Sequence, residues 1–215
     1  MYAQASAKIE LPSHFQQPHP SPAFEGAAVQ PVSFFPAGTE IYAQGEKAGV
    51  LYQVEFGAVR IYRLLADGRR QISAFHLAGE IFGFEADSTH HFFAEAINST
   101  GVRVYRIASA TDMSRQLLPL ALKGLTRAQE HLLVLGRQNA IERVAAFLLE
   151  MADRQGGLRQ VDLPMSRNDI GDYLGLTIET VSRVLTRLKE KGVIRLLSLR
   201  SVEILKRDTL LAMGE

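Results

Sequence analysis

The hydrophobic pattern of the chain changes near Ala108, and this change limits what the chain can fold into. From Val32 to this point, short β-branched and aromatic runs are interrupted by glycines about every 8 to 12 residues, which is typical of a small antiparallel sandwich or barrel. Asp67-Gly68 is predicted to form a hairpin turn, because Asp and Gly tolerate the positive φ that a primed turn requires. The clearest expected strands are Leu51–Phe56, Val59–Arg63, Gln71–His76 and Val102–Ile107.

Beyond Ala108 the apolar residues recur with the period of a helix. A stripe with intervals of 4, 3, 4 and 3 residues is formed by Ala121, Leu125, Ala128, Leu132 and Leu135. Such a narrow seam favours a partner helix and hence a homodimer. The alternative is a helix that packs on the core of its own domain. A second helix is expected from Gln138 to Arg154, where Gln155-Gly156-Gly157 ends it.

The composition limits the chemistry that is open to the chain. It has no Cys among 215 residues, which excludes disulfides, thiolate zinc sites, Cys-bound iron–sulfur clusters and Cys nucleophiles. No apolar run approaches the roughly 20 residues of a membrane span, and no secretory signal is found, so a cytoplasmic protein is expected. We find no nucleophile–base pair, phosphate-cradling loop or metal-spaced carboxylates, and expect neither an enzyme nor a bound cofactor or metal. Residues 1–31, rich in Pro, Gln, Ser and His, are expected to be a flexible tail.

Charge is distributed unevenly along the chain, although 24 Lys and Arg nearly balance 23 Asp and Glu. Between Gln71 and Val102 there is no Lys or Arg. In contrast, the stretch 183–200 contains Arg183, Arg187, Lys189, Lys191, Arg195 and Arg200 against Glu190 alone. A locally basic end of the molecule indicates a surface for nucleic acid.

The segment 163–192 has the organisation of two short helices joined by a tight turn. Ser166 with Asp169 resembles a capping box that opens the first helix, and Gly175 supplies the turn. Gly171 lies in the middle of the first helix, where Gly costs about 1 kcal/mol relative to Ala. We expect its small size to allow the close approach of another helix.

The second helix of this unit is expected to begin after Thr177, which caps it, and to end at Gly192. Its expected inward face is formed by Ile178, Val181, Leu185 and Leu188. After Gly192 the sequence predicts two strands around a turn near residues 197–200. Together these features predict a winged helix-turn-helix.

The outward face of the second helix carries polar side chains that are suited to reading DNA bases: Glu179, Ser182, Arg183 and Thr186. Arg183 can donate two hydrogen bonds to guanine, Glu179 can accept one from cytosine, and Ser182 can bond to several base edges. The alternative is a solvated Glu179–Arg183 salt bridge one helical turn apart. Further DNA contacts are expected from Ser166, Thr177, Ile178, Thr180, Thr186, Arg187 and Arg200.

The stretch Asp169–Arg183 resembles the DNA-binding signature of the CRP/FNR superfamily of bacterial transcription regulators, and its Glu-x-x-Ser-Arg arrangement is similar to the FNR and FixK branch. His76–Glu85 resembles a segment of the sensory roll of that family. The resemblance implies an α+β fold: an N-terminal antiparallel β-roll of the cyclic-nucleotide-binding type over 32–108, a dimerisation helix over 109–137 and a C-terminal winged helix-turn-helix over 138–215. It also implies a homodimeric activator that binds double-stranded DNA at a TTGAT-N4-ATCAA-like palindrome, contacts RNA polymerase and serves oxygen-responsive gene control.

The resemblance also bears on whether a small effector is bound. Cyclic-nucleotide-binding members of the family carry a Glu for the ribose and an Arg for the phosphate, whereas this chain has Gly83-Phe84 there and no cation between Gln71 and Val102. The chain therefore resembles the FixK type, which acts without a known small effector. The alternative is an effector-gated sensor, in which His76 or the pair His90-His91 offers ligands to haem.

Overall fold

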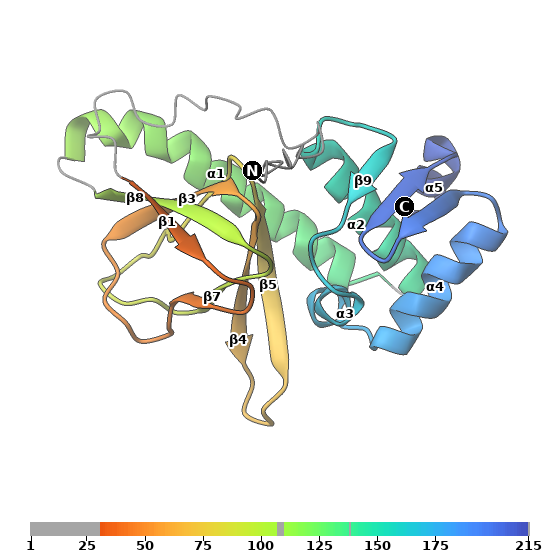
Figure 1. Ribbon diagram of the computed structural model, residues 1–215, viewed down its shortest axis with the longest axis horizontal. Coiled ribbons are helices and arrows are strands. Elements are labelled where there is room, and N and C mark those ends of the chain that lie inside the picture. Colours follow the sequence, from red (N-terminus) through yellow and green to blue (C-terminus); the bar gives the residue numbers. More distant parts are fainter. Residues whose placement is uncertain (1–30, 107–109, 138, 215) are drawn as a thin grey trace, which may run out of the picture.

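The computed structural model describes residues 31–106, 110–137 and 139–214, and the side chains of 110–116 are not among the parts described. The expected tail lies almost wholly outside these residues. The chain forms a β-roll at one end and an α/β module at the other, and one long helix runs from the first to the second (Figure 1). Within the described residues, no helix is both long enough and apolar enough to cross a membrane.

The roll consists of two four-stranded antiparallel sheets, with strand orders β1-β8-β3-β6 and β2-β7-β4-β5. Its strands are β1 (Val32–Phe35), β2 (Glu40–Tyr42), β3 (Val50–Phe56), β4 (Ala58–Leu64), β5 (Arg70–Leu77), β6 (Ile81–Phe82), β7 (Phe93–Ala96) and β8 (Thr100–Arg106). The four strands expected from the sequence match β3, β4, β5 and β8. Their buried side chains, including Val54, Val59, Phe82 and Val102, form the core between the sheets.

The hairpin between β4 and β5 is where it was predicted, but its turn is of another type. Gly68 has a φ of 80°, whereas Asp67 keeps a negative φ, so the two-residue primed turn is wrong. The Gly68 amide donates to the Leu65 carbonyl at 2.9 Å, and the Leu65 amide donates to the Arg69 carbonyl at 2.8 Å. This pattern is a three-residue loop with the glycine at its bulge position.

The long helix α1 (Ala110–Leu135) carries the apolar stripe, and much of that stripe faces solvent in the single chain. Leu125 is 54% exposed and Leu132 is 67% exposed. Leu118, Leu122 and Leu133 add further exposed apolar surface. Ala121 and Leu135 are half-buried, and Ala128 is exposed. The alternative that the stripe is core of its own domain therefore fails for Leu125 and Leu132.

The C-terminal module is built around helix α2, whose side chains form most of its core, among them Val144, Phe147, Leu148 and Met151. It consists of α2 (Ala140–Arg154), β9 (Gln160–Asp162), α3 (Arg167–Leu174), α4 (Ile178–Glu190), β10 (Ile194–Ser198), β11 (Ser201–Ile204) and α5 (Arg207–Gly214). The wing strands β10 and β11 confirm the two strands expected after Gly192, and β9 extends their sheet. Strand β9 and helix α5 were not anticipated from the sequence.

Candidate nucleic-acid interface and the cavity of the roll

The capping box at the start of α3 has the predicted geometry. The Ser166 hydroxyl accepts a hydrogen bond from the Asp169 amide at 3.0 Å, and the Asp169 carboxylate accepts one from the Ser166 amide at 2.9 Å. Each side chain thus satisfies a backbone N–H that the first turn of the helix leaves free. Ser166, expected as a DNA contact, is half-buried and uses its hydroxyl in this cap.

The turn between α3 and α4 depends on two glycines. Gly175 has a φ of 64°, in the left-handed region, and ends α3. A Cβ on Gly171 would lie 2.6 Å from the carbonyl oxygen of Leu176. The prediction that Gly171 allows a close approach is confirmed, but the neighbour is the backbone of the turn and not another helix.

Helix α4 is oriented by an inward face of buried residues: Val181, Val184, Leu185 and Leu188. Thr177 caps the helix, since its hydroxyl accepts from the Thr180 amide at 3.2 Å. Ile178, expected on the inward face, is 42% exposed, so that assignment is wrong and Val184 takes its place. The reason is helical geometry: at 3.6 residues per turn Ile178 lies at the edge of the arc that the other apolar residues define.

The outward face of α4 presents polar side chains to solvent. Glu179, Arg183 and Thr186 are exposed and Ser182 is half-buried. Ser182, Arg183 and Thr186 also line one open hollow in the surface. Within the described residues no ion pair joins Glu179 to Arg183, so the salt-bridge alternative is not formed. Hydrogen bonds from the backbone amide of Glu179 itself and from Thr177 lower the pKa of Glu179, which keeps it an ionised acceptor.

The other expected DNA contacts surround this face. Thr177 and Thr180 lie at the start of α4 with their hydroxyls 3.1 Å apart, and Arg187 is exposed one turn beyond Arg183. Arg200 lies in the turn of the wing and donates a hydrogen bond to the Pro164 carbonyl just before α3. The wing and the entry to α3 are therefore held together.

Arg167, the first residue of α3, was not singled out from the sequence. Its Nη1 donates to the Ser182 hydroxyl at 3.2 Å and so links the two helices of the unit. Because α3 and α4 meet here through a long side chain, spacing alone could not reveal the contact.

The roll is joined to α3 by a cluster of ion pairs in which Asp169 is buried and its partners are half-buried. Arg70 Nη2 lies 2.5 Å from Asp169 Oδ1 and 2.8 Å from Asp172 Oδ2, and Arg60 Nη1 lies 3.0 Å from Asp169 Oδ1. Burial by itself raises the pKa of Asp169, but hydrogen bonds from Ser166 and the two arginines hold it below its usual value. The first helix of the DNA-binding unit is thus fixed to strands β4 and β5.

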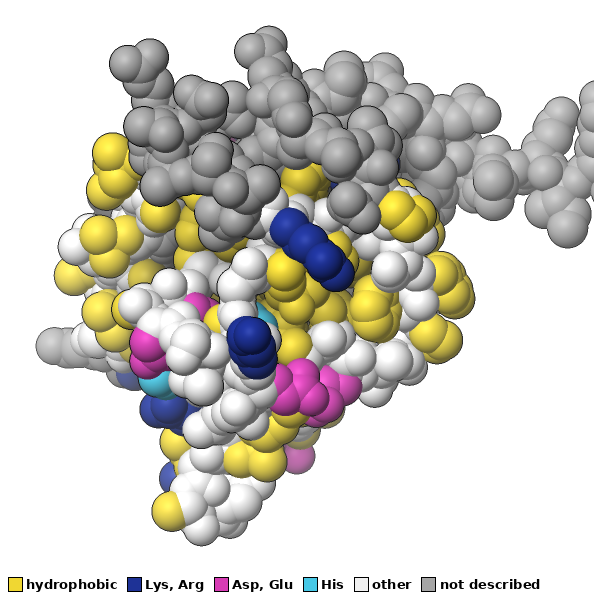
Figure 2. All heavy atoms as spheres, turned by 90° about the vertical axis from the view of Figure 1, so that its left-hand side faces the viewer, with side chains coloured by type: hydrophobic (Ala, Val, Ile, Leu, Met, Phe, Trp, Pro, Cys, Tyr) yellow, Lys and Arg dark blue, Asp and Glu magenta, His cyan; other side chains and the backbone are white. Residues whose placement is uncertain are grey.

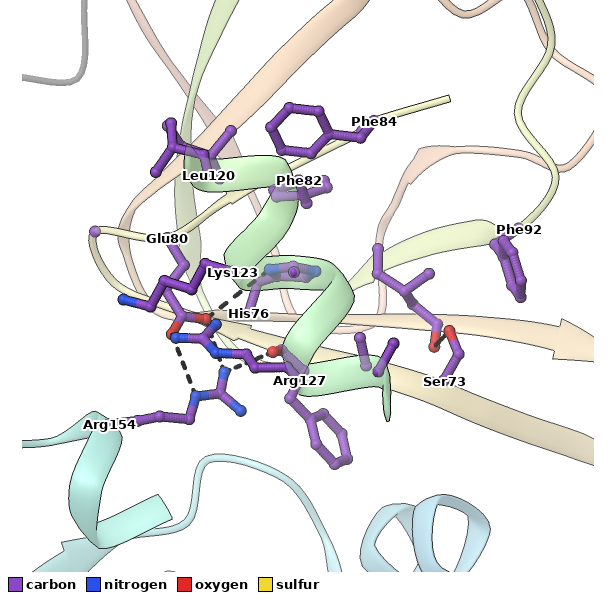
Figure 3. A pocket seen from close by; sticks show the side chains of 18 of the residues that line it. Ser73, His76, Glu80, Phe82, Phe84, Phe92, Leu120, Lys123, Arg127 and Arg154 are labelled. Carbon is purple, nitrogen blue, oxygen red and sulfur yellow. Dashed lines mark hydrogen bonds and ion pairs between the residues drawn. The ribbon is translucent and has the colours of Figure 1, made fainter. Parts of the chain in front are cut away.

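A cavity of about 290 Å³ lies between the roll and α1 (Figure 3). Glu80 forms ion pairs with Arg127 of α1 at 2.9 Å and with Arg154 of α2 at 2.7 Å. Lys123 also lines the cavity, and in the described part of the chain it has no carboxylate partner. The sequence argument that this region lacks cations is therefore incomplete, because helices outside residues 71–102 supply them. Burial lowers the pKa of His76 to about 4, so this ring beside Glu80 is neutral at pH 7.

The histidines considered for haem are engaged by neighbouring side chains. His90 is buried, stacks on Tyr42 with ring centroids 3.6 Å apart, and lies 3.1 Å from a Glu85 oxygen. His91 is hydrogen-bonded to Asp87 at 2.9 Å. The Nδ1 of His90 is used by Glu85 and the Nε2 of His91 by Asp87, whereas the buried Nε2 of His90 has no hydrogen-bond partner among the described residues.

A roll joined through a long helix to a winged helix-turn-helix defines a DNA-binding transcription regulator. Residues 142–213 match the Crp-like helix-turn-helix domain, and residues 32–112 match the cyclic nucleotide-binding domain. The chain is 55% identical to the nitrogen fixation regulation protein FixK of Rhizobium meliloti over 98% of each chain, and 44% identical to FixK of Azorhizobium caulinodans over 88% of this chain and 81% of that protein. The structure of FixK2 from Bradyrhizobium japonicum matches with a TM-score of 0.81 and 43% identity, over 87% of this chain and 98% of that one.

The chain therefore belongs to the CRP/FNR family of transcription regulators and is not an enzyme. The expected α+β architecture of β-roll, long helix and helix-turn-helix is confirmed.

Proposed function

We propose that the chain acts as a homodimeric activator that reads a TTGAT-N4-ATCAA-like palindrome with Glu179, Ser182 and Arg183. The observation that carries this proposal is the arrangement of α4, whose inward face is packed while these side chains lie together on the opposite face. The expected half-site contains one G·C pair. Arg183 can donate to guanine O6 and N7 of that pair, while ionised Glu179 accepts from cytosine N4.

The exposed stripe of α1 supports the homodimer. Leu125 and Leu132 are large, apolar and exposed in the single chain, and burying them against a second copy removes them from water. Ala121 and Ala128 are small enough to let two helices approach closely. Pairing the chains through α1 gives two copies of α4, and these fit half-sites separated by one turn of DNA, about 34–36 Å.

Action without a cyclic nucleotide is supported by Glu80. Glu80 and Glu150 together balance the charges of Arg127 and Arg154, so the phosphate of a nucleotide would meet negative charge beside the cations it needs. Phe82 and His76, stacked with ring centroids 5.3 Å apart, occupy the same wall of the cavity. Lys123, which lines the cavity without a carboxylate partner among the described residues, favours the second candidate function, a sensor that admits a small anion.

Oxygen-responsive control and contact with RNA polymerase are proposed because the resemblance to the FNR and FixK branch implies them. Two relatives are named for the regulation of nitrogen fixation, and a third, 36% identical over 73% of this chain, is the fumarate and nitrate reduction regulatory protein of Vibrio cholerae. These names concern nitrogen fixation and the reduction of fumarate and nitrate. In the described part of this end of the roll, Figure 2 shows several groups of hydrophobic side chains and only a few Lys or Arg side chains. This face therefore suits a protein partner better than DNA.

The test of base reading is Arg183→Ala, measured by DNA binding on the palindrome and on unrelated duplexes. We expect a loss of about 1–3 kcal/mol on the palindrome and much less on unrelated DNA. Arg187→Ala is the matched variant. If Arg187 touches phosphate, this substitution weakens binding to all sequences and lowers the slope of log affinity against log salt by about one. Equal losses of binding free energy on both kinds of DNA for Arg183→Ala would show that Arg183 does not read a base.

Effector independence is tested with millimolar cAMP or cGMP added to the purified protein. We expect DNA affinity and transcription to be unchanged. A tenfold gain, equivalent to about 1.4 kcal/mol of coupling, would establish the sensor function instead.

A further inference from the structure

We propose that Arg167 is a positioning residue that makes the Ser182 hydroxyl a hydrogen-bond donor toward DNA, and thereby fixes to which base edges Ser182 can donate. The inference rests on the proposed function, in which the outward face of α4 meets the bases. According to this proposal, Arg167 of α3 contributes to the base specificity of α4.

The geometry assigns the direction of the hydrogen bond without ambiguity. A guanidinium has only donors, so in the 3.2 Å contact between Arg167 Nη1 and Ser182 Oγ the serine must accept. A serine hydroxyl has two lone pairs but only one hydrogen. Once a lone pair points at Arg167, the single hydrogen is left for another acceptor.

The neighbouring threonine shows what a hydroxyl on this helix does without such a partner. Thr186 donates its hydroxyl hydrogen at 3.0 Å to the backbone carbonyl of Ser182, four residues earlier. Ser and Thr side chains commonly satisfy themselves in this way inside helices. Within the described residues, the Ser182 hydroxyl has Arg167 as its partner, and its hydrogen is not consumed by the helix backbone.

The Arg167 side chain is held between the helices. It is half-buried, and its Nε is buried with no hydrogen-bond partner among the described residues. Ser182 is half-buried in the middle of the outward face, beside the exposed Arg183. The guanidinium therefore reaches the DNA face through the serine that it orients.

This arrangement predicts a chemical preference at one base pair. A donor hydroxyl pairs with guanine O6 or N7, adenine N7 or thymine O4, whereas the amino group of cytosine can use only the remaining lone pair and leaves the hydroxyl hydrogen unpaired. Without Arg167 the hydroxyl is free to turn back to the helix carbonyl, as in Thr186, and the preference is lost.

The test compares Arg167→Met, Ser182→Ala and the double variant of the full-length protein, on duplexes in which each base pair of the half-site is changed in turn. Methionine keeps most of the length and apolar stem of arginine but has no donor. We expect Arg167→Met to reduce the preference at one base pair by about two- to tenfold, the same base pair that Ser182→Ala affects. In the Ser182→Ala background, Arg167→Met should cause no further change in that preference. With Ser182 present, Arg167→Lys, which keeps a donor, should retain part of the preference that Arg167→Met loses. Arg195→Ala, which removes an exposed arginine of β10, is the control and should leave the preference unchanged.

The outcomes separate this inference from the proposed function. Arg167→Met could instead reduce DNA affinity equally on every duplex, lower the slope of affinity against salt by about one, and do so in the Ser182→Ala background as well. That result would make Arg167 a phosphate contact and overturn its positioning role. A normal preference in both single variants, while Arg183→Ala loses specificity, overturns the inference and leaves the proposed function standing. Loss of specificity by neither Arg183→Ala nor Ser182→Ala overturns the proposed function itself. Circular dichroism of each variant shows whether α3 and α4 remain folded.

Discussion

Asp169 lies at the joint between the roll and the DNA-binding unit, and replacing it with Asn is expected to weaken both its helix cap and its ion pairs. The residue is 3% exposed, caps α3 with Ser166, and receives hydrogen bonds from Arg60 and Arg70. Asn retains the shape and an acceptor oxygen but not the charge. The variant therefore tests the electrostatic contribution rather than the packing.

The magnitude follows from the partners that remain. A cap contributes about 1 kcal/mol, and a hydrogen bond to a charged group about 1.5–3 kcal/mol. Neither arginine is left alone, because Arg60 keeps Glu95 and Arg70 keeps Asp172. We therefore expect Asp169→Asn to lower the free energy of unfolding by about 2–4 kcal/mol, below the cost of stranding a buried charge. Asp172→Asn, which removes a more exposed carboxylate outside the cap, should cost less than about 1 kcal/mol.

The assay is urea unfolding followed by circular dichroism, with all proteins at one protomer concentration because association adds to stability. The pKa of Asp169 is depressed in the folded state, so its stabilisation is present above the unfolded pKa of about 3.9 and is lost as the pH falls through the folded value. The difference in the free energy of unfolding between wild type and Asp169→Asn should thus persist from pH 7 to pH 5 and shrink only below about pH 3.9. Equal losses for Asp169→Asn and Asp172→Asn, or a gap that closes already at pH 5, would refute the reasoning.

Three further predictions concern α1 and α3. Leu132→Asp should place charges in the α1 stripe, separate the subunits and abolish DNA binding. Leu211→Asp, at an exposed leucine of α5, should do neither. An unchanged mass of Leu132→Asp in sedimentation would contradict the α1 interface. Gly171→Ala should destabilise by about 1–3 kcal/mol, despite the better helix propensity of Ala, because its Cβ meets backbone at 2.6 Å; a thermal melt at or above that of wild type contradicts this. His131 stacks on Tyr173 at 3.8 Å, and burial lowers its pKa to about 4, so its neutral form stabilises the fold above about pH 6.5 and this contribution is lost as the pH falls toward 4. Between pH 7 and pH 5, the free energy of unfolding of wild type should fall by about 1–2 kcal/mol more than that of His131→Phe. Parallel pH profiles of the two proteins in urea titrations would argue against a buried neutral ring.

The features predicted correctly from the sequence depend on residues close together in the chain. Ser166 and Asp169 are three residues apart, and Gly175 acts on its own backbone, so local spacing is enough to recognise the helix-turn-helix. Ile178 was misplaced because a residue at the edge of an apolar arc cannot be assigned to one side by spacing. The contacts that were missed join distant segments: Arg70 and Asp169 are 99 residues apart, and Glu80 meets Arg154 across 74 residues. No local pattern encodes such pairs, because only the packed domains bring them together.

The clamp of Arg60 and Arg70 on α3 has a consequence for operator architecture. Because α3 is joined by ion pairs to strands β4 and β5, helix α4 cannot move independently of the roll to follow a displaced half-site. An extra base pair between half-sites both lengthens the separation and rotates the second half-site around the duplex axis. In the proposed homodimer, two α4 helices held in this way cannot correct both errors, so the length of the spacer between the half-sites is expected to affect binding.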